Sequence, residues 1–99
     1  MEERNKLVLL YDFYSELLSD SQKKYSEQYY FDNLSLGEIS EELNVSRNAV
    51  HKQIKSACEK LYFYEEKLSL IKISEEIKDI ITQIDDKKIK ERLSKLIES

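Results

Sequence analysis

The side chains best suited to recognising a ligand lie close together in the middle of the chain. Five polar or basic side chains occur at helical spacing between positions 47 and 55, and the only histidine is among them. Arginine can donate two hydrogen bonds to guanine, asparagine can pair with adenine, and lysine can contact phosphates. These residue types therefore indicate nucleic-acid recognition. The candidate residues are Arg47, Asn48, His51, Lys52 and Lys55.

The residues around His51 do not support a catalytic or metal-binding role. The chain has no second histidine, and Cys58 is its only cysteine, so the ligand spacing of a zinc site is missing. Cys58 follows His51 at an offset that does not by itself bring the two side chains together, and we expect it to be a small buried residue. A single glycine cannot form a glycine-rich phosphate loop. We expect no metal, no cofactor and no enzymatic activity.

Two short helices must position the candidate residues, and the stretch Ser35–Ile54 has the signals for both. Ser35 with Glu38 three residues later is a capping box that starts the first helix, residues 36–43. Asn44 tolerates the left-handed conformation that ends helices, and Ser46 can cap the second helix. This is the spacing of a helix-turn-helix, which presents its second helix outward to a groove. The apolar positions that would hold the pair together are Ile39, Leu43, Ala49, Val50 and Ile54.

The charge of the chain limits what such a helix can do. The formal net charge is −4, whereas a dedicated duplex-DNA binder is usually basic because phosphate contacts supply much of the affinity. Residues 36–60 hold four acidic and four basic side chains, and three of the acids precede the second helix. A basic helix in an acidic body would confine contact to that helix. The candidate side chains could equally form a solvated helix face without a ligand.

The rest of the sequence predicts further helices with short connections, since it has no proline and one glycine. Apolar spacing predicts helices over residues 3–17 and 20–31. A last helix follows a cap at Asp85 or Asp86 and runs to about Ile97, and the second helix of the pair has no obvious stop and could continue to about Lys67. The seven Tyr and three Phe side chains could stack on single-stranded bases, but core packing is the expectation. The predicted fold class is therefore all-α.

A boundary near Leu68 is expected between a helix-turn-helix domain, residues 1–68, and a C-terminal helical extension, residues 69–99. The extension has no aromatic residue, and its apolar residues at positions 70–84 recur in steps of three and four, the seam of a coiled coil. The sequence leaves open whether a helix runs through residues 68–74. The seam could pack on the same chain or on a second copy, and we expect a homodimer.

The sequence also bears on where the protein works. No stretch approaches the roughly 20 apolar residues that a membrane-spanning helix needs. The N-terminus combines an acidic start with a short apolar run, which is not the pattern of a signal peptide. The single cysteine fits a reducing compartment. We therefore expect a cytoplasmic protein without membrane insertion.

Five short stretches between Leu10 and Leu68 occur together in one known family. They are LYDFY (10–14), LSD (18–20), YY (29–30), SLGEISEELNVSRNAV (35–50) and YEEKL (64–68). In this combination they resemble the YlxM family of bacterial proteins, whose fold is similar to region four of bacterial sigma factors. Gly37 and Asn44 stand where such motifs often have alanine and glycine. Gly37 should weaken its helix by up to about 1 kcal/mol relative to alanine.

The resemblance implies a function in protein targeting. YlxM proteins are cytoplasmic and are typically encoded beside Ffh, the GTPase of the signal recognition particle. The resemblance thus implies an accessory or regulatory component of that pathway, with the particle's RNA, Ffh and the receptor FtsY as partners. Two alternatives stay open. One is a sequence-specific DNA-binding transcriptional regulator in which Arg47, Asn48 and His51 read bases. The other is an adaptor that binds protein and no nucleic acid.

Overall fold

The chain is all-α over the residues that the structure describes. A computed structural model of the protein describes residues 2–98, with side chains from Arg4 onward, and this part contains no strand. A 3-10 turn over Ser15–Leu17 follows the first helix, and a π-helical turn over Glu27–Phe31 extends the second. The helices are α1 (Glu2–Tyr14), α2 (Asp20–Ser26), α3 (Leu36–Leu43), α4 (Arg47–Leu68), α5 (Leu70–Ile81) and α6 (Lys87–Ile97).

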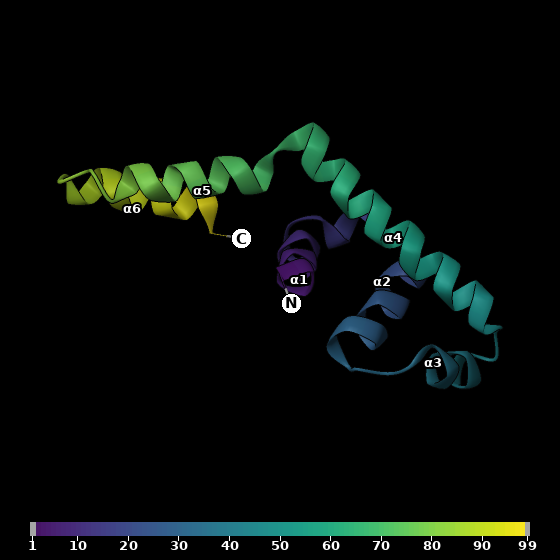
Figure 1. Cartoon of the computed structure of the whole chain (residues 1–99). Coiled ribbons are helices and arrows are strands. Elements are labelled where there is room, and N and C mark those ends of the chain that lie inside the picture. Colours follow the sequence, from purple (N-terminus) through teal and green to yellow (C-terminus); the bar gives the residue numbers. More distant parts are fainter. Residues whose placement is uncertain (1, 99) are drawn as a thin grey trace.

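The molecule is a compact body with a projecting arm. Its extents are 56 × 24 × 24 Å and its radius of gyration is 17.1 Å, against about 13 Å for a compact chain of 100 residues. Helix α4 is the spine: α1, α2 and α3 all pack against it, while α5 and α6 pair with each other and extend away from the body (Figure 1). We call α5, α6 and their connection, residues 70–97, the arm.

The main core joins α1 to the second half of α4. Leu7, Leu10 and Tyr14 follow one another at steps of three and four, so they lie on one face of α1 and are buried there. Ala57 and Leu61 of α4 cover that face, and Ile71 at the start of α5 completes the cluster, together with Leu18. The main core therefore includes the first turn of the arm.

A smaller core lies under the helix-turn-helix. Ile39 of α3 and Val50 of α4 are completely buried against each other's helices, with Ile54 one turn further along α4. Partly buried side chains of Tyr25, Leu36 and Leu43 close the cluster at its edges. These apolar positions hold α3 and α4 together as the sequence predicts.

The break between α4 and α5 settles the path of the chain around residues 68–74. Ser69 adopts left-handed backbone dihedrals, φ 56° and ψ 29°, which end α4 at Leu68. The backbone N–H of Ser69 still donates to the carbonyl of Glu65 at 2.9 Å, and α5 begins at once with Leu70. The chain therefore turns sharply at one residue.

Packing of the aromatic side chains departs from the sequence-based expectation at three positions. Core packing is confirmed for Tyr14, which is 1% exposed, but Tyr29, Phe31 and Phe63 are exposed. Tyr29 and Phe31 lie in the π-helical turn, and Phe63 lies on α4 beyond its contact with α2. Phe31 still makes a tilted ring contact with Tyr11 of α1, at 5.2 Å between ring centroids, so its exposure is partial.

Candidate nucleic-acid interface

The turn between α3 and α4 is fixed by backbone hydrogen bonds around Asn44. Asn44 is left-handed, with φ 55° and ψ 47°. The N–H of Val45 donates to the carbonyl of Ser40 at 3.0 Å, and the N–H of Asn44 donates to the carbonyl of Glu41 at 3.4 Å. This pair of bonds is a Schellman motif, which satisfies the last carbonyls of α3. The turn is thus short and defined, as the sequence predicts.

Side-chain caps set where both helices begin. The Ser35 hydroxyl accepts from the N–H of Glu38 at 3.1 Å, and the Glu38 carboxylate accepts from the N–H of Ser35 at 3.1 Å, so the predicted capping box is confirmed. The Ser46 hydroxyl accepts from the N–H of Ala49 at 3.0 Å and starts α4 at Arg47. The first turn of α4 therefore has a fixed direction relative to α3.

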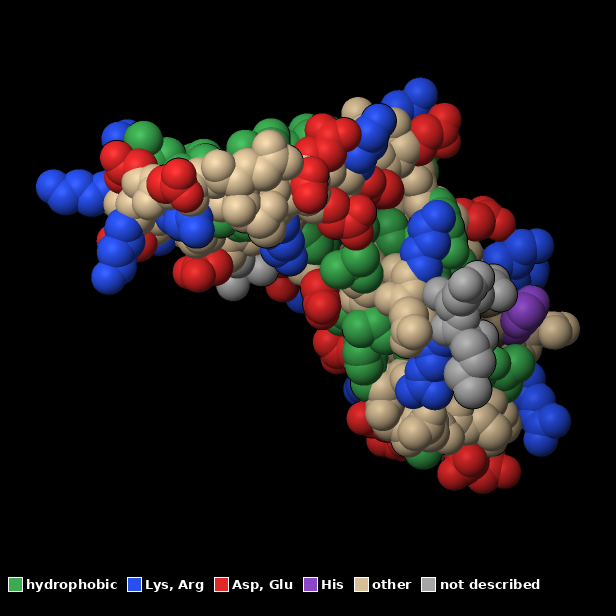
Figure 2. Space-filling view, turned by 60° about the vertical axis from the view of Figure 1, so that its left-hand side comes forward, with side chains coloured by type: hydrophobic (Ala, Val, Ile, Leu, Met, Phe, Trp, Pro, Cys, Tyr) green, Lys and Arg blue, Asp and Glu red, His purple; other side chains and the backbone are tan. Residues whose placement is uncertain are grey.

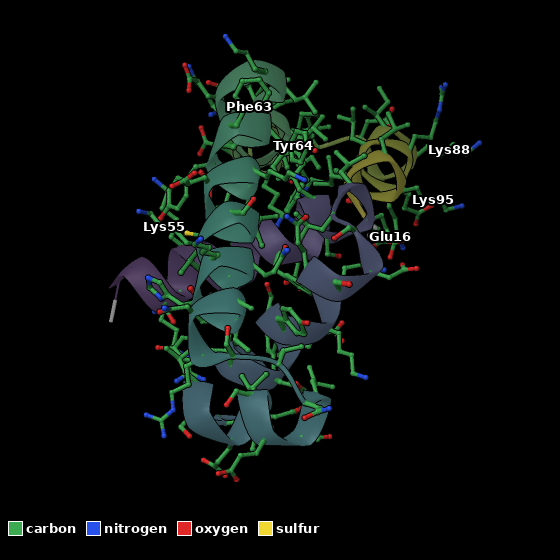
Figure 3. The ribbon with its side chains drawn as sticks, turned by 90° about the vertical axis from the view of Figure 1, so that its right-hand side faces the viewer. Glu16, Lys55, Phe63, Tyr64, Lys88 and Lys95 are labelled. Atoms are coloured by element: carbon green, nitrogen blue, oxygen red, sulfur yellow. The ribbon has the colours of Figure 1, made fainter. Side chains whose placement is uncertain are left out.

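All five candidate residues lie on the exposed side of α4. Val50 and Ile54 are buried against α3, which directs the opposite side of the helix to solvent. Asn48 and Lys52 are four residues apart and form one row, which Lys55 continues. Figure 3 shows Lys55 on the side of α4 away from α2. In Figure 2 the histidine, coloured purple, lies at the surface with basic side chains above and below it. The exposed residues are Arg47, Asn48, His51, Lys52 and Lys55.

Arg47 lies beside the chain's only glycine. An ideal Cβ placed on Gly37 would come within 2.8 Å of Nη2 and 3.2 Å of Cζ of Arg47. The guanidinium therefore lies directly over the first turn of α3, in space that the absent side chain leaves open. This contact gives Gly37 a structural role in placing Arg47, which its low helix propensity does not reveal.

The positive charges of this face are not neutralised within the chain. Among the side chains of residues 4–98, the one ion pair joins Lys23 to Glu16 at 3.2 Å, far along the sequence from the candidate residues. The first turn of α4 has no acidic residue, and the helix macrodipole adds partial positive charge at that end. The exposed acids Glu38, Glu41 and Glu42 of α3 border the face. Within the helix-turn-helix, the basic side chains therefore lie on α4 and the acidic ones on α3.

A shallow groove beside this face contains residues that the sequence did not single out. It has a volume of about 370 Å³ and runs between the π-helical turn and α4. Tyr29, on one wall, makes an edge contact with Tyr30 at 5.1 Å between ring centroids, and His51 and Lys55 form the other wall. The tyrosine pair at positions 29–30 was the available signal, but the helical pattern assigned both rings to the core.

Nothing in the described part of the chain forms a metal site. Within residues 4–98 no group of three or more His, Cys, Asp or Glu side chains is placed to hold a metal ion. Cys58 is half-buried and packs against the main core. None of the helices in this range combines the length and apolar character required to cross a bilayer.

Comparison with known proteins places these features in a family. Residues 1–99 match the model of the family UPF0122, described as "Putative helix-turn-helix protein, YlxM / p13 like". The UPF0122 protein lmo1802 of Listeria monocytogenes is 41% identical over 96% of the chain and 94% of its own length. The UPF0122 protein BH2485 of Halalkalibacterium halodurans is 42% identical over 100% of the chain and 94% of its own length. The UPF0122 protein TTE1463 of Caldanaerobacter subterraneus is 49% identical over 79% of the chain and 67% of its own length.

Proposed function

The chain belongs to the YlxM/p13-like helix-turn-helix family, and on this premise we propose that it binds nucleic acid through the outward face of α4. The observation that supports the proposal most strongly is the unpaired row of Asn48, Lys52 and Lys55 on a capped helix whose opposite side is buried. A lysine without an acidic partner keeps its full attraction for phosphate, and an exposed asparagine can pair with an unstacked or groove-exposed base.

The biological setting that we propose is the bacterial signal recognition particle pathway. The protein acts there as a cytoplasmic accessory or regulatory component and not as an enzyme. Its ligand is the particle's RNA, its protein partners are the GTPases Ffh and FtsY, and it works as a homodimer. The net charge of −4 is consistent with a small specific site, because it disfavours non-specific binding to nucleic acid.

The experiment that tests the proposal compares two nucleic acids under identical salt. Fluorescence anisotropy at about 0.15 M salt is measured with labelled particle RNA and with a duplex DNA of the same length. We expect saturable binding of the RNA, weakened at least about tenfold in the Lys52→Ala/Lys55→Ala variant. The matched control is Lys24→Ala/Lys67→Ala, which removes the same charge from α2 and from the last turn of α4. An RNA affinity equal to that of the duplex, or equal losses in the two variants, would contradict the proposal.

The exposed first turn of α4 favours one alternative, a transcriptional regulator that reads duplex DNA. Arg47 and Asn48 occupy the positions from which a recognition helix reaches base edges in the major groove, and the fold would then be used like region four of a sigma factor. Selection of bound fragments from genomic DNA distinguishes the two functions. Enrichment of one sequence motif supports the regulator, and its absence alongside RNA binding supports the pathway component.

A further inference from the structure

The arm leaves much of its apolar surface uncovered by the rest of the described chain. Helix α6 has no buried residue, and α5 has two, Ile71 and Ser74. The seam that the sequence predicts at positions 70–84 stays largely open: Ile73 is 47% exposed and Ile80 is 52% exposed. Helix α6 packs against α5 near Ile81, and Ile77 of the seam is half-buried. Large apolar side chains also remain exposed on α6, at Ile89 (46%) and Leu96 (77%).

The open stripes of α5 and α6 point to the same side of the arm. Ile81 and Ile97 line the crevice between the two helices. In each helix the exposed apolar residue directly precedes the residue at the crevice. Around its own helix axis, Ile80 therefore lies about 100° from Ile81, and Leu96 lies about 100° from Ile97 in the same sense along the chain. Because the two helices run antiparallel, equal rotations direct both stripes to one face. We call this the open face of the arm; Figure 2 shows apolar side chains along the upper edge of the arm.

The two long edges of the open face differ in charge. Glu76 and Asp79 directly precede Ile77 and Ile80, so they lie on the outer edge of α5. By the same geometry Lys88 and Lys95 lie on the outer edge of α6, and both extend from the same side of that helix (Figure 3). Arg92 adds to the basic edge and Lys72 offsets part of the acidic edge. None of these side chains forms an ion pair in the described chain, whose single pair is Lys23 with Glu16.

We propose that a second copy of the chain covers the open face, so that two arms form a four-helix bundle. Two symmetric arrangements bury the stripes. In one the two-fold axis runs along the helices and α5 lies over the partner's α6; in the other the axis crosses them and each helix lies over its own copy. Only the first brings the acidic edge of one arm beside the basic edge of the other. In the second arrangement each edge would face the same edge of the partner, and repulsion between like charges would disfavour it.

The charge of the whole arm also favours a second copy over nucleic acid as the occupant. Residues 69–98 hold seven acidic and seven basic side chains, so the arm is neutral and its edges are complementary to each other. Polyanionic phosphate would meet Glu76 and Asp79 along one edge. In the arrangement with the two-fold axis along the helices, both bodies lie at the same end of the four-helix bundle. The two α4 faces then lie at one end of the dimer.

The first test measures mass in solution by sedimentation equilibrium over a range of protein concentrations. We expect a dimer for the natural sequence and a monomer for Ile73→Glu/Ile80→Glu, which places two charges on the open face. The matched control is Phe63→Glu, an exposed apolar residue of α4 outside the arm, which should stay dimeric. A natural chain that is monomeric throughout the range, or an Ile73→Glu/Ile80→Glu variant that still dimerises, would overturn the interface.

The second test decides the arrangement by exchanging the charges of the edges. Lys88→Glu/Arg92→Glu makes both edges acidic and should raise the dimer Kd about tenfold at low salt. Adding Glu76→Lys/Asp79→Lys in the same chain reverses both edges and should restore the natural Kd. If each helix lay over its own copy, Lys88→Glu/Arg92→Glu would not weaken the dimer in this way, and the four-residue variant would not restore the natural Kd. An unchanged Kd in the first variant therefore overturns the arrangement.

The arm interface rests on the homodimer of the proposed function and specifies how that homodimer forms. It does not depend on RNA binding. Each variant is therefore also titrated with the labelled particle RNA, with circular dichroism confirming that its helices are retained. A monomeric chain that binds RNA contradicts the arm interface alone. A dimer that binds neither RNA nor DNA contradicts the nucleic-acid function and leaves the interface standing.

Discussion

The hydroxyl of Tyr14 lies 2.5 Å from Oε1 of Glu65 and joins the end of α1 to the end of α4. Both groups also serve the first turn of α5. The N–H of Leu70 donates to the Tyr14 hydroxyl at 3.1 Å, and the Glu65 carboxylate accepts from the N–H groups of Ile71 and Lys72 at 3.0 and 3.3 Å. Ser69 makes no side-chain cap. The Tyr14–Glu65 pair therefore replaces a local cap and sets the direction of the arm.

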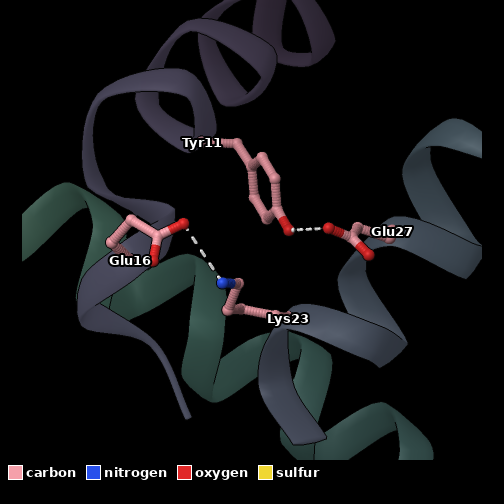
Figure 4. Close-up of polar contacts among 4 residues, drawn as sticks. All are labelled: Tyr11, Glu16, Lys23 and Glu27. Atoms are coloured by element: carbon pink, nitrogen blue, oxygen red, sulfur yellow. Dashed lines mark hydrogen bonds and ion pairs between the residues drawn. The ribbon is translucent and has the colours of Figure 1, made fainter. Parts of the chain in front are cut away.

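Replacing Tyr14 with phenylalanine should destabilise the protein by about 1–3 kcal/mol. The change leaves the Leu70 N–H without an acceptor and removes a donor from a partly buried carboxylate. Urea unfolding followed by circular dichroism measures the difference. The matched control is Tyr11→Phe, whose hydroxyl donates to Glu27 at 2.6 Å in an exposed pair (Figure 4) and should matter less. Equal losses in the two variants would show that the Tyr14–Glu65 pair has no special role.

A fall in pH should weaken the contact of Glu65 with Tyr14 and with the first turn of α5. Burial tends to raise the pKa of Glu65, but the hydrogen bonds from Tyr14 and from the backbone N–H groups of Ile71 and Lys72 outweigh it and lower that pKa below the ordinary 4.5. A group with a lowered folded-state pKa stabilises the fold above its unfolded pKa, and that contribution is lost as pH falls through the folded pKa.

The variant Glu65→Gln isolates this effect because its side chain does not titrate. We expect the free energy of unfolding of the natural chain to exceed that of the variant by a constant amount at pH 6–8. The gap should shrink below about pH 4.5, the ordinary pKa of a glutamate. Urea titrations at a series of pH values measure the gap. A gap that stays constant down to pH 3 would contradict the assignment.

The helix-turn-helix could be predicted closely from sequence because its signals are local. The bounds of α3 match the expected 36–43, and the caps at Ser35 and Ser46 and the left-handed Asn44 are confirmed. Each signal depends on residues within four positions of one another, so no knowledge of packing is needed. The nucleic-acid roles of the α4 side chains stay predictions.

The joint at Ser69 and the groove beside α4 could not be predicted in the same way. Serine has no intrinsic preference for the left-handed region, and the acceptors that stabilise the turn come from Tyr14, 55 residues earlier in the chain, as well as from Glu65. Tyr29 lies in the π-helical turn, whose spacing differs from the α-helical period that the sequence pattern assumes. Both features depend on tertiary contacts, which the periodicity of the sequence does not reveal.

Alanine in place of Gly37 should stabilise the protein by up to about 1 kcal/mol. Alanine is the better helix former, and its Cβ would lie closest to the end of the unpaired Arg47 side chain, which can move aside. Thermal unfolding measures the gain. The comparison variant is Gly37→Ala/Arg47→Ala, in which no guanidinium has to move, and its gain over Arg47→Ala should be equal or slightly larger. A net loss of stability in Gly37→Ala would show that the guanidinium contact itself stabilises α3.

Single changes on α4 should separate phosphate contacts from base contacts. Lys52→Ala removes a charge that can meet phosphate, so RNA binding should weaken for every sequence, and the slope of log K against log salt should fall by about 0.7–0.9. Asn48→Ala removes no charge, so its affinity loss should leave the slope unchanged and depend on the base opposite it. Anisotropy titrations between about 0.05 and 0.2 M salt yield both slopes. If Asn48→Ala changes the slope as Lys52→Ala does, its loss arises from a rearranged interface and not from a missing base contact.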